Sequence, residues 1–94
     1  MGFKDAKAKI LSALANGTYQ HEARGNIDEK NKLAVGEVTA DEVREIIKKC
    51  RGGDHTHSPH HMDSSLTVHV LRKSGWYIKF YFIDPDALFI SVHK

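Results

Sequence analysis

The chain has 94 residues, of which 40% are hydrophobic, 28% charged and 9% aromatic, and its net charge is +2. These values are ordinary for a globular protein and exclude collagen-like, disordered and transmembrane classes, because no apolar run approaches the roughly 20 residues that span a bilayer. The length favours a single domain over residues 1–94, and the small net charge does not by itself indicate nucleic-acid binding. The unusual feature of the composition is its seven histidines.

The first half of the chain, residues 1–52, has helical periodicity. A first apolar stripe predicts a helix that ends at Asn16-Gly17, and its members are Phe3, Ala6, Ile10, Leu11 and Leu14. A second helix is expected after Thr39, because Thr39 and Glu42 have the spacing of a capping box. Its stripe consists of Val43, Ile46, Ile47 and Cys50, and Gly52-Gly53 ends it.

The segment between these helices carries a polar pair. Residues 18–21 suggest a short extended piece, and residues 26–32 suggest a loop or one helical turn. His21 and Arg24 are three residues apart, so one helical turn would place them on the same side as a candidate substrate-binding pair. The alternative is an exposed surface pair without function.

Four of the histidines lie in the segment 55–61. The composition suits a metal site, but no cysteine accompanies these histidines, Pro59 prevents regular helical placement, and the spacing matches no closed zinc site. We therefore expect no metal and no cofactor, and predict a polar loop between the second helix and a sheet. Such a loop could overhang the sheet, with His60 and His61 as substrate-contacting residues; a metal-binding protein that uses the His55–His61 loop stays an alternative.

Residues 65–93 have the alternating pattern of strands, separated by turn signals at Lys73-Ser74-Gly75 and Asp84-Pro85-Asp86. Short connections favour an antiparallel meander of at least three strands. The two helices need an apolar partner, and one face of the sheet supplies it. The predicted fold class is therefore α+β, with two N-terminal helices packed on one face of a C-terminal antiparallel sheet.

Alternation also predicts a polar face on the other side of the sheet. If Trp76, Ile78, Phe80 and Phe82 face the helices, then Tyr77, Lys79 and Tyr81 face away from them. By the same logic we expect Thr67 and His69 on the first strand, and Ser91 and His93 on the last, to share that face. A bland interpretation is that these are ordinary side chains on a solvated sheet.

This set of side chains has the chemistry for RNA cleavage without a metal. His69 and His93 could move protons to and from the 2′-hydroxyl and the 5′-oxygen, because histidine titrates near neutrality. Lys79 and Arg72 could stabilise charge on the phosphate, and Tyr81 could donate a proton or stack against a base.

The C-terminal segments Trp76–Phe80 and Phe89–Lys94 resemble the motility-quorum-sensing-regulator toxins of bacterial toxin–antitoxin systems, in which a Tyr-Ile/Leu-Lys strand leads through a hairpin to a closing strand. His21-x-x-Arg24 and the segment that begins at Val38 resemble a related group of small toxin-like domains. Both groups look like members of the barnase, colicin-nuclease and RelE superfamily. The sequence departs from this pattern in its histidine loop and in Val68-His69-Val70, which replaces an Asp-Val-Tyr strand.

The resemblance implies a RelE-like endoribonuclease toxin that cleaves single-stranded RNA, with mRNA as the expected substrate, and that a cognate antitoxin neutralises, with or without the ribosome as a partner. It implies roles for Lys79 and His93 above all. We expect a cytoplasmic protein with no membrane partner, because a lone cysteine, Cys50, suits a reducing compartment and the first residues lack the pattern of a secretory signal. The alternative function is a non-catalytic RNA- or protein-binding module.

Overall fold

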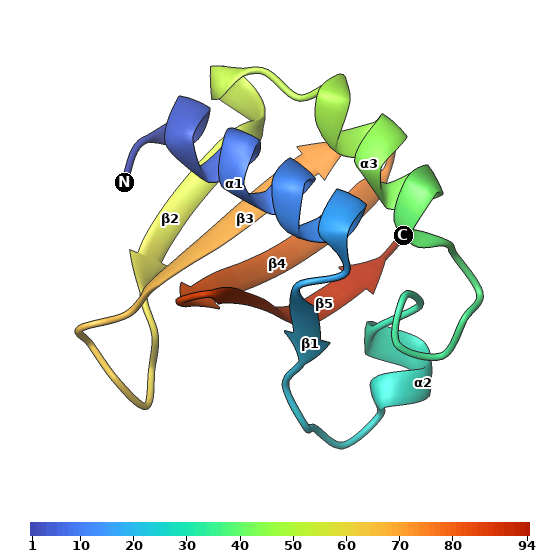
Figure 1. Cartoon of the computed structure of the whole chain (residues 1–94). Coiled ribbons are helices and arrows are strands. Elements are labelled where there is room, and N and C mark those ends of the chain that lie inside the picture. The colour runs from blue at the N-terminus through green and yellow to red at the C-terminus, as the bar shows by residue number, and fades with distance from the viewer.

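The computed structural model describes all residues from 1 to 94 and has an α+β architecture, as predicted. The helices are α1 (Phe3–Asn16), α2 (Ile27–Lys30) and α3 (Ala40–Lys48), followed by a 3-10 turn, η1 (Gly52–Asp54). The strands are β1 (Tyr19–His21), β2 (His55–Pro59), β3 (Thr67–Lys73), β4 (Trp76–Ile83) and β5 (Asp86–His93) (Figure 1). None of the helices is both long enough and apolar enough to cross a membrane.

The five strands form one mixed sheet in the order β1-β5-β4-β3-β2. Strands β2 to β5 are antiparallel neighbours, whereas β1 lies parallel to β5 at the opposite edge. The prediction of a loop for residues 55–59 was therefore wrong, because this segment pairs with β3 as an edge strand. Pro59 is compatible with that position, since it is the last residue of an edge strand. Its missing N–H therefore removes no hydrogen bond between inner strands of the sheet.

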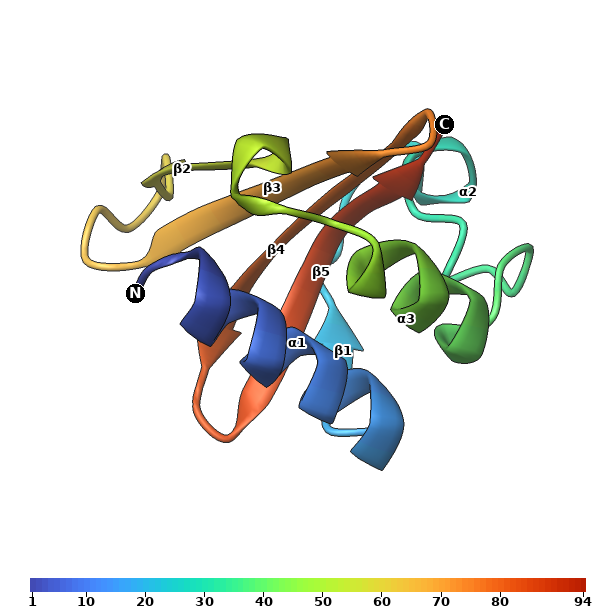
Figure 2. The same cartoon turned by 90° about the horizontal axis from the view of Figure 1, so that it is seen from above.

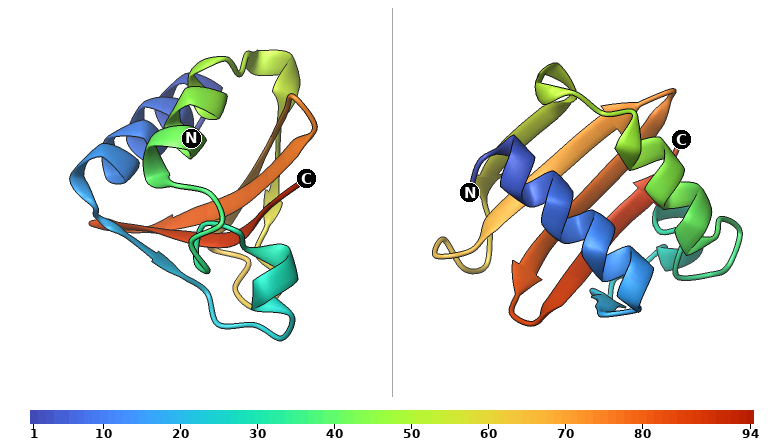
Figure 3. Two further views of the ribbon diagram at one scale, coloured as in Figure 1. Left: turned by 90° about the vertical axis from the view of Figure 1, so that its right-hand side faces the viewer. Right: turned by 45° about the horizontal axis from the view of Figure 1, so that its top comes forward.

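Helices α1 and α3 lie beside each other across the same face of the sheet (Figures 2 and 3). The predicted capping box of α3 is confirmed: Thr39 Oγ1 accepts from the Glu42 N–H over 3.1 Å, and Glu42 Oε1 accepts from the Thr39 N–H over 3.0 Å. The main core joins both helices to the sheet and includes Ile10, Leu14, Val43, Ile47, Leu71, Ile78, Phe80, Phe89 and Val92. We call the opposite side of the sheet the far face.

A β-bulge in the β4–β5 pairing decides which side chains reach the far face. Lys79 pairs with Ser91 and Phe80 pairs with Phe89, so Ile90 is an extra residue in β5. Simple alternation would put Phe89 on the same side as Ser91, but the bulge turns Phe89 into the main core. Ile90 instead joins Val68 and Tyr81 in a small second apolar cluster. The far face is therefore partly apolar and not uniformly polar.

His69 does not lie on the far face, which corrects the prediction made from alternation. The far-face side chains of β3 are those of Val68, Val70 and Arg72, because these positions pair with far-face positions of β4. The His69 ring lies on the helix side, 5.6 Å from the Phe80 ring and 5.8 Å from the Phe82 ring, and only 1% of it is exposed. The prediction failed because it assumed that Val68 and Val70 face the helices, which would turn His69 to the opposite side.

The buried His69 is paired with another histidine. His55 Nε2 and His69 Nδ1 are 2.9 Å apart and the rings are stacked, so one neutral imidazole donates to the other. Burial, with the neighbouring His55 as the next cause, lowers the pKa of His69 from 6.5 to about 4. Burial also lowers the pKa of His55.

This pairing predicts a loss of stability in mild acid. The unfolded chain binds a proton at His69 near pH 6.5 and the folded chain only near pH 4, so the stabilisation is complete above pH 6.5 and is lost as the pH falls toward 4. At about 1.36 kcal/mol per pKa unit, the contribution reaches up to about 3 kcal/mol. The free energy of unfolding, measured in urea from pH 7 to pH 4, should depend less on pH in His69→Phe than in the wild type. The control His93→Gln should keep the wild-type dependence on pH. An equal slope in both variants would contradict it.

Candidate functional site

Two adjoining hollows on the far face form the candidate site. Their volumes are about 390 and 220 Å³. Glu22, His61, Lys79 and Ile90 line both of them. Arg24 and Met62 border the larger hollow, and Ser58, Pro59 and His60 border the smaller. The side chains thus come from the segment after β1, the end of β2 and the loop after it, and strands β4 and β5, and together they form what we call the far-face pocket.

Glu22 is the carboxylate of this pocket, and two neighbours fix its position. Its Oε1 accepts one hydrogen bond from the Tyr81 hydroxyl and one from His60 Nε2, each over 3.1 Å. Burial and this bond raise the pKa of Tyr81, so the tyrosine keeps its proton and remains a donor. The second oxygen of Glu22 has no protein partner, and 29% of the side chain is exposed. One oxygen is held while the other is free for a ligand.

The two loop histidines have different environments. His60 is only 7% exposed, and its Nδ1 accepts from the Met62 N–H over 3.0 Å while its Nε2 donates to Glu22. Because both ring nitrogens are occupied, His60 holds Glu22 in place and is not free to shuttle protons. His61 is exposed, stacks on His60 at 5.0 Å and lines both hollows. Of the pair, His61 is the one with a ring available to a substrate.

Two cations complete the far-face pocket. One guanidinium nitrogen of Arg24 donates to the Ile90 carbonyl over 3.1 Å and to Ser91 Oγ over 2.9 Å, which anchors Arg24 on the bulge of β5. The remaining N–H groups of Arg24 have no protein partner. Lys79 lines both hollows and has no carboxylate within salt-bridge distance. An anion in the pocket would therefore meet Arg24 and Lys79 together.

The structure places other predicted residues elsewhere. His21 and Arg24 do not share a side, because β1 sends His21 to the helix side, where its Nδ1 is 2.9 Å from the Asn31 side-chain nitrogen. Burial lowers the pKa of His21. Arg72 and His93 do lie on the far face, but beside Tyr77 at the neighbouring end of the sheet and outside the pocket.

Sequence reasoning missed Glu22, which belongs to the pocket as firmly as Lys79. The available signal was its position: if residues 18–21 form a strand, alternation extended by one residue puts Glu22 on the face opposite His21. The backbone confirms that continuation, since the Glu22 N–H donates to the Phe89 carbonyl over 2.9 Å.

The histidines of residues 55–61 are distributed over two sides of the sheet. His55 and His57 are on the helix side with His69, whereas His60 and His61 lie at the far-face pocket. No three His, Cys, Asp or Glu side chains come together in an arrangement that could hold a metal ion.

Comparisons of the chain with protein families, with curated proteins and with solved structures find no match.

The hydrogen bond from Tyr81 to Glu22 should be measurable as stability. Tyr81→Phe removes a buried donor to a charged acceptor, so we expect the free energy of unfolding in urea at pH 7 to fall by about 1.5 kcal/mol. Tyr77→Phe on the same strand is the matched control, because the Tyr77 hydroxyl has no partner; its change should stay within about 0.5 kcal/mol. Equal effects of both substitutions would show that the bond does not stabilise the fold.

Proposed function

We propose that this protein is a metal-independent endoribonuclease that cleaves single-stranded RNA by attack of a 2′-hydroxyl on the adjacent phosphate. The observation that carries the proposal is the convergence of a carboxylate, an exposed imidazole and two cations in one pocket, namely Glu22, His61, Lys79 and Arg24. This is a complete set of groups for a reaction that needs a base, an acid and a stabiliser of phosphate charge.

In the proposed mechanism, the free oxygen of Glu22 accepts the proton of the 2′-hydroxyl. The 2′-oxygen then bonds to phosphorus, and the bond to the 5′-oxygen breaks as His61 donates a proton to that leaving group. Lys79 and Arg24 stabilise the negative charge that develops on the phosphate oxygens. Tyr81 and His60 act as positioning residues, because both hold Glu22 through its other oxygen.

The wider proposal is a cytoplasmic, RelE-like toxin that an antitoxin neutralises. It is supported by the order of elements, in which α1 and α3 precede the antiparallel run from β2 to β5, and by the resemblance of the segments 76–80 and 89–94 to toxins. The position of Lys79 in the pocket agrees with the role that the resemblance implies for it. An antitoxin that inhibits this site would cover the far-face pocket.

Two substitutions test the chemistry directly. Glu22→Gln keeps an oxygen that accepts from Tyr81 and His60 but removes the base, so the cleavage rate of a labelled single-stranded RNA should fall by about a hundredfold or more. Lys79→Gln removes a phosphate contact and should lower the rate by about a hundredfold. Single-turnover rates in EDTA are the measurement.

The matched pair for the acid is His61→Gln and His57→Gln, since His57 is an exposed histidine on the helix side. Only His61→Gln should slow cleavage. A wild-type protein that leaves RNA intact, or a Glu22→Gln protein with wild-type rate, contradicts the mechanism. RNA binding without cleavage would instead identify a non-catalytic binding module.

The toxin proposal makes a separate prediction for living cells. Induced expression of the wild-type chain in bacteria should arrest growth, because cleavage of mRNA stops protein synthesis. Glu22→Gln should be tolerated at equal protein level, measured by colony counts and immunoblot. Normal growth with abundant wild-type protein would refute the proposed toxicity.

A further inference from the structure

A second group of side chains on the far face lies one step along β4 from the far-face pocket. Tyr77 stands two residues before Lys79, so the two side chains emerge on the same face about 6.8 Å apart along the strand. Across the sheet, Tyr77 pairs with Arg72 on β3 and with His93 on β5. The three residues form what we call the Arg72–Tyr77–His93 row.

The row is a set of stacked planar groups. The Arg72 guanidinium carbon lies 5.1 Å from the centre of the Tyr77 ring. On the other side, the His93 ring lies 5.2 Å from that ring at an interplanar angle of 24°. Tyr77 thus separates two planar groups, and nucleic-acid bases stack on both imidazole rings and guanidinium planes.

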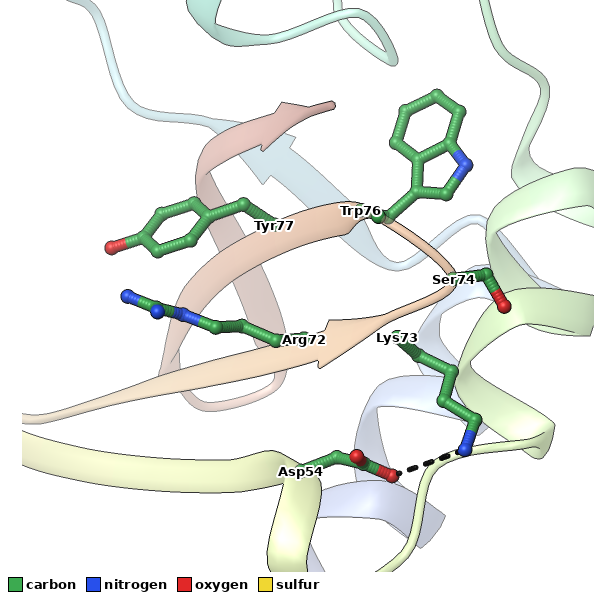
Figure 4. A pocket seen from close by; sticks show the side chains of 7 residues that line it. Asp54, Arg72, Lys73, Ser74, Trp76 and Tyr77 are labelled. Atoms are coloured by element: carbon green, nitrogen blue, oxygen red, sulfur yellow. Dashed lines mark ion pairs between the residues drawn. The ribbon is translucent and has the colours of Figure 1, made fainter.

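The charge of the row is also available. Arg72 is exposed and has no carboxylate partner, whereas its neighbour Lys73 pairs with Asp54 at 3.7 Å. Figure 4 shows this division: Arg72 and Tyr77 extend side by side, and Lys73 turns toward Asp54. These residues border an open hollow of about 770 Å³ at the β3–β4 hairpin. His93 Nδ1 donates to the Lys94 carbonyl over 3.0 Å, and its Nε2 has no protein partner.

From this geometry we propose that the Arg72–Tyr77–His93 row binds the nucleotide next to the cleaved bond, with Arg72 on its phosphate and its base stacked on the row. The inference rests on the proposed ribonuclease function, because it assigns the substrate strand a direction along β4 from the far-face pocket to the row. It also gives His93 a binding role in place of proton transfer. Arg72 and His93 contact RNA directly, and Tyr77 is a positioning residue that spaces them.

The test measures binding without cleavage. The probe is a fluorescein-labelled hexauridylate with 2′-O-methyl groups, whose blocked 2′-oxygens cannot attack, and fluorescence anisotropy gives its dissociation constant. Arg72→Gln should weaken binding about tenfold, which is the scale of one stacking contact. It should also make the dependence of log affinity on log salt shallower by about 0.7, as expected for one lost phosphate contact on a single strand.

Variants at Tyr77 distinguish a specific row from a general effect on folding. Tyr77→Ala should weaken binding by about tenfold. Tyr77→Phe, which keeps the ring, should bind with wild-type affinity. Lys4→Gln is the control for charge, because Lys4 is an exposed lysine on α1, on the other side of the sheet. It should bind with wild-type affinity.

Wild-type affinity and salt dependence in Arg72→Gln would overturn the inference, and so would a wild-type protein that does not bind the hexanucleotide. Cleavage of natural RNA by the wild-type protein separates this inference from the proposed function. If RNA is cleaved but Arg72→Gln binds normally, only the row is refuted. If RNA is not cleaved but binding depends on Arg72, the row stands as an RNA-binding surface and the nuclease is refuted.

Discussion

The single extra residue in β5 is the constraint on which the rest of the structure depends. Because Ile90 has no partner on β4, the side chains before and after it are out of phase, so Phe89 and Val92 both point into the main core. Ile90 lines the far-face pocket and packs against Val68 and Tyr81. The Ile90 carbonyl and the Ser91 hydroxyl together hold Arg24. Without the bulge, alternation would put Phe89 on the far face and take it out of the main core that it shares with Val92.

The far-face pocket illustrates how a small sheet protein can hold a carboxylate near lysine and arginine without neutralising it. Glu22 Oε1 accepts from the Tyr81 hydroxyl and from His60 Nε2, and neither Lys79 nor Arg24 bonds to it. Because neither cation is held in an ion pair with Glu22, Lys79 and Arg24 remain free for a second, negatively charged group. A direct ion pair would satisfy both partners and leave little attraction for a phosphate. The contacts with Tyr81 and His60 position Glu22 and leave both cations available.

The features that sequence predicts well are those set by local physics. The capping box at Thr39 and Glu42 depends on residues three apart, and the outward direction of Lys79 and Tyr81 depends on alternation within one strand. The broad α+β class follows from the same patterns. What the sequence could not reveal depends on pairing between distant segments: the burial of His69 beside His55, the parallel contact of β1 with β5, and the bulge at Ile90.

Glu22 combines both kinds of information: alternation puts it opposite His21, but only the pairing of β1 with β5 brings residues 22–24 to the far face. The seven histidines take several separate structural places: His21 at Asn31, His55 and His57 near His69, His60 and His61 at the pocket, and His93 beside Tyr77. The four histidines of residues 55–61 are close in sequence but not in space, because β2 places its two on the helix side and the loop after β2 places the other two at the far-face pocket.

The parallel pairing of β1 with β5 also has a consequence for the order of events during synthesis. β1 is made early, yet its hydrogen-bonding partner is the last strand, and Arg24 finds its acceptors only on that strand. A growing chain that has not yet released residues 86–93 from the ribosome has no assembled pocket. The topology thus lets the pocket assemble only after residues 86–93 have been made and have left the ribosome.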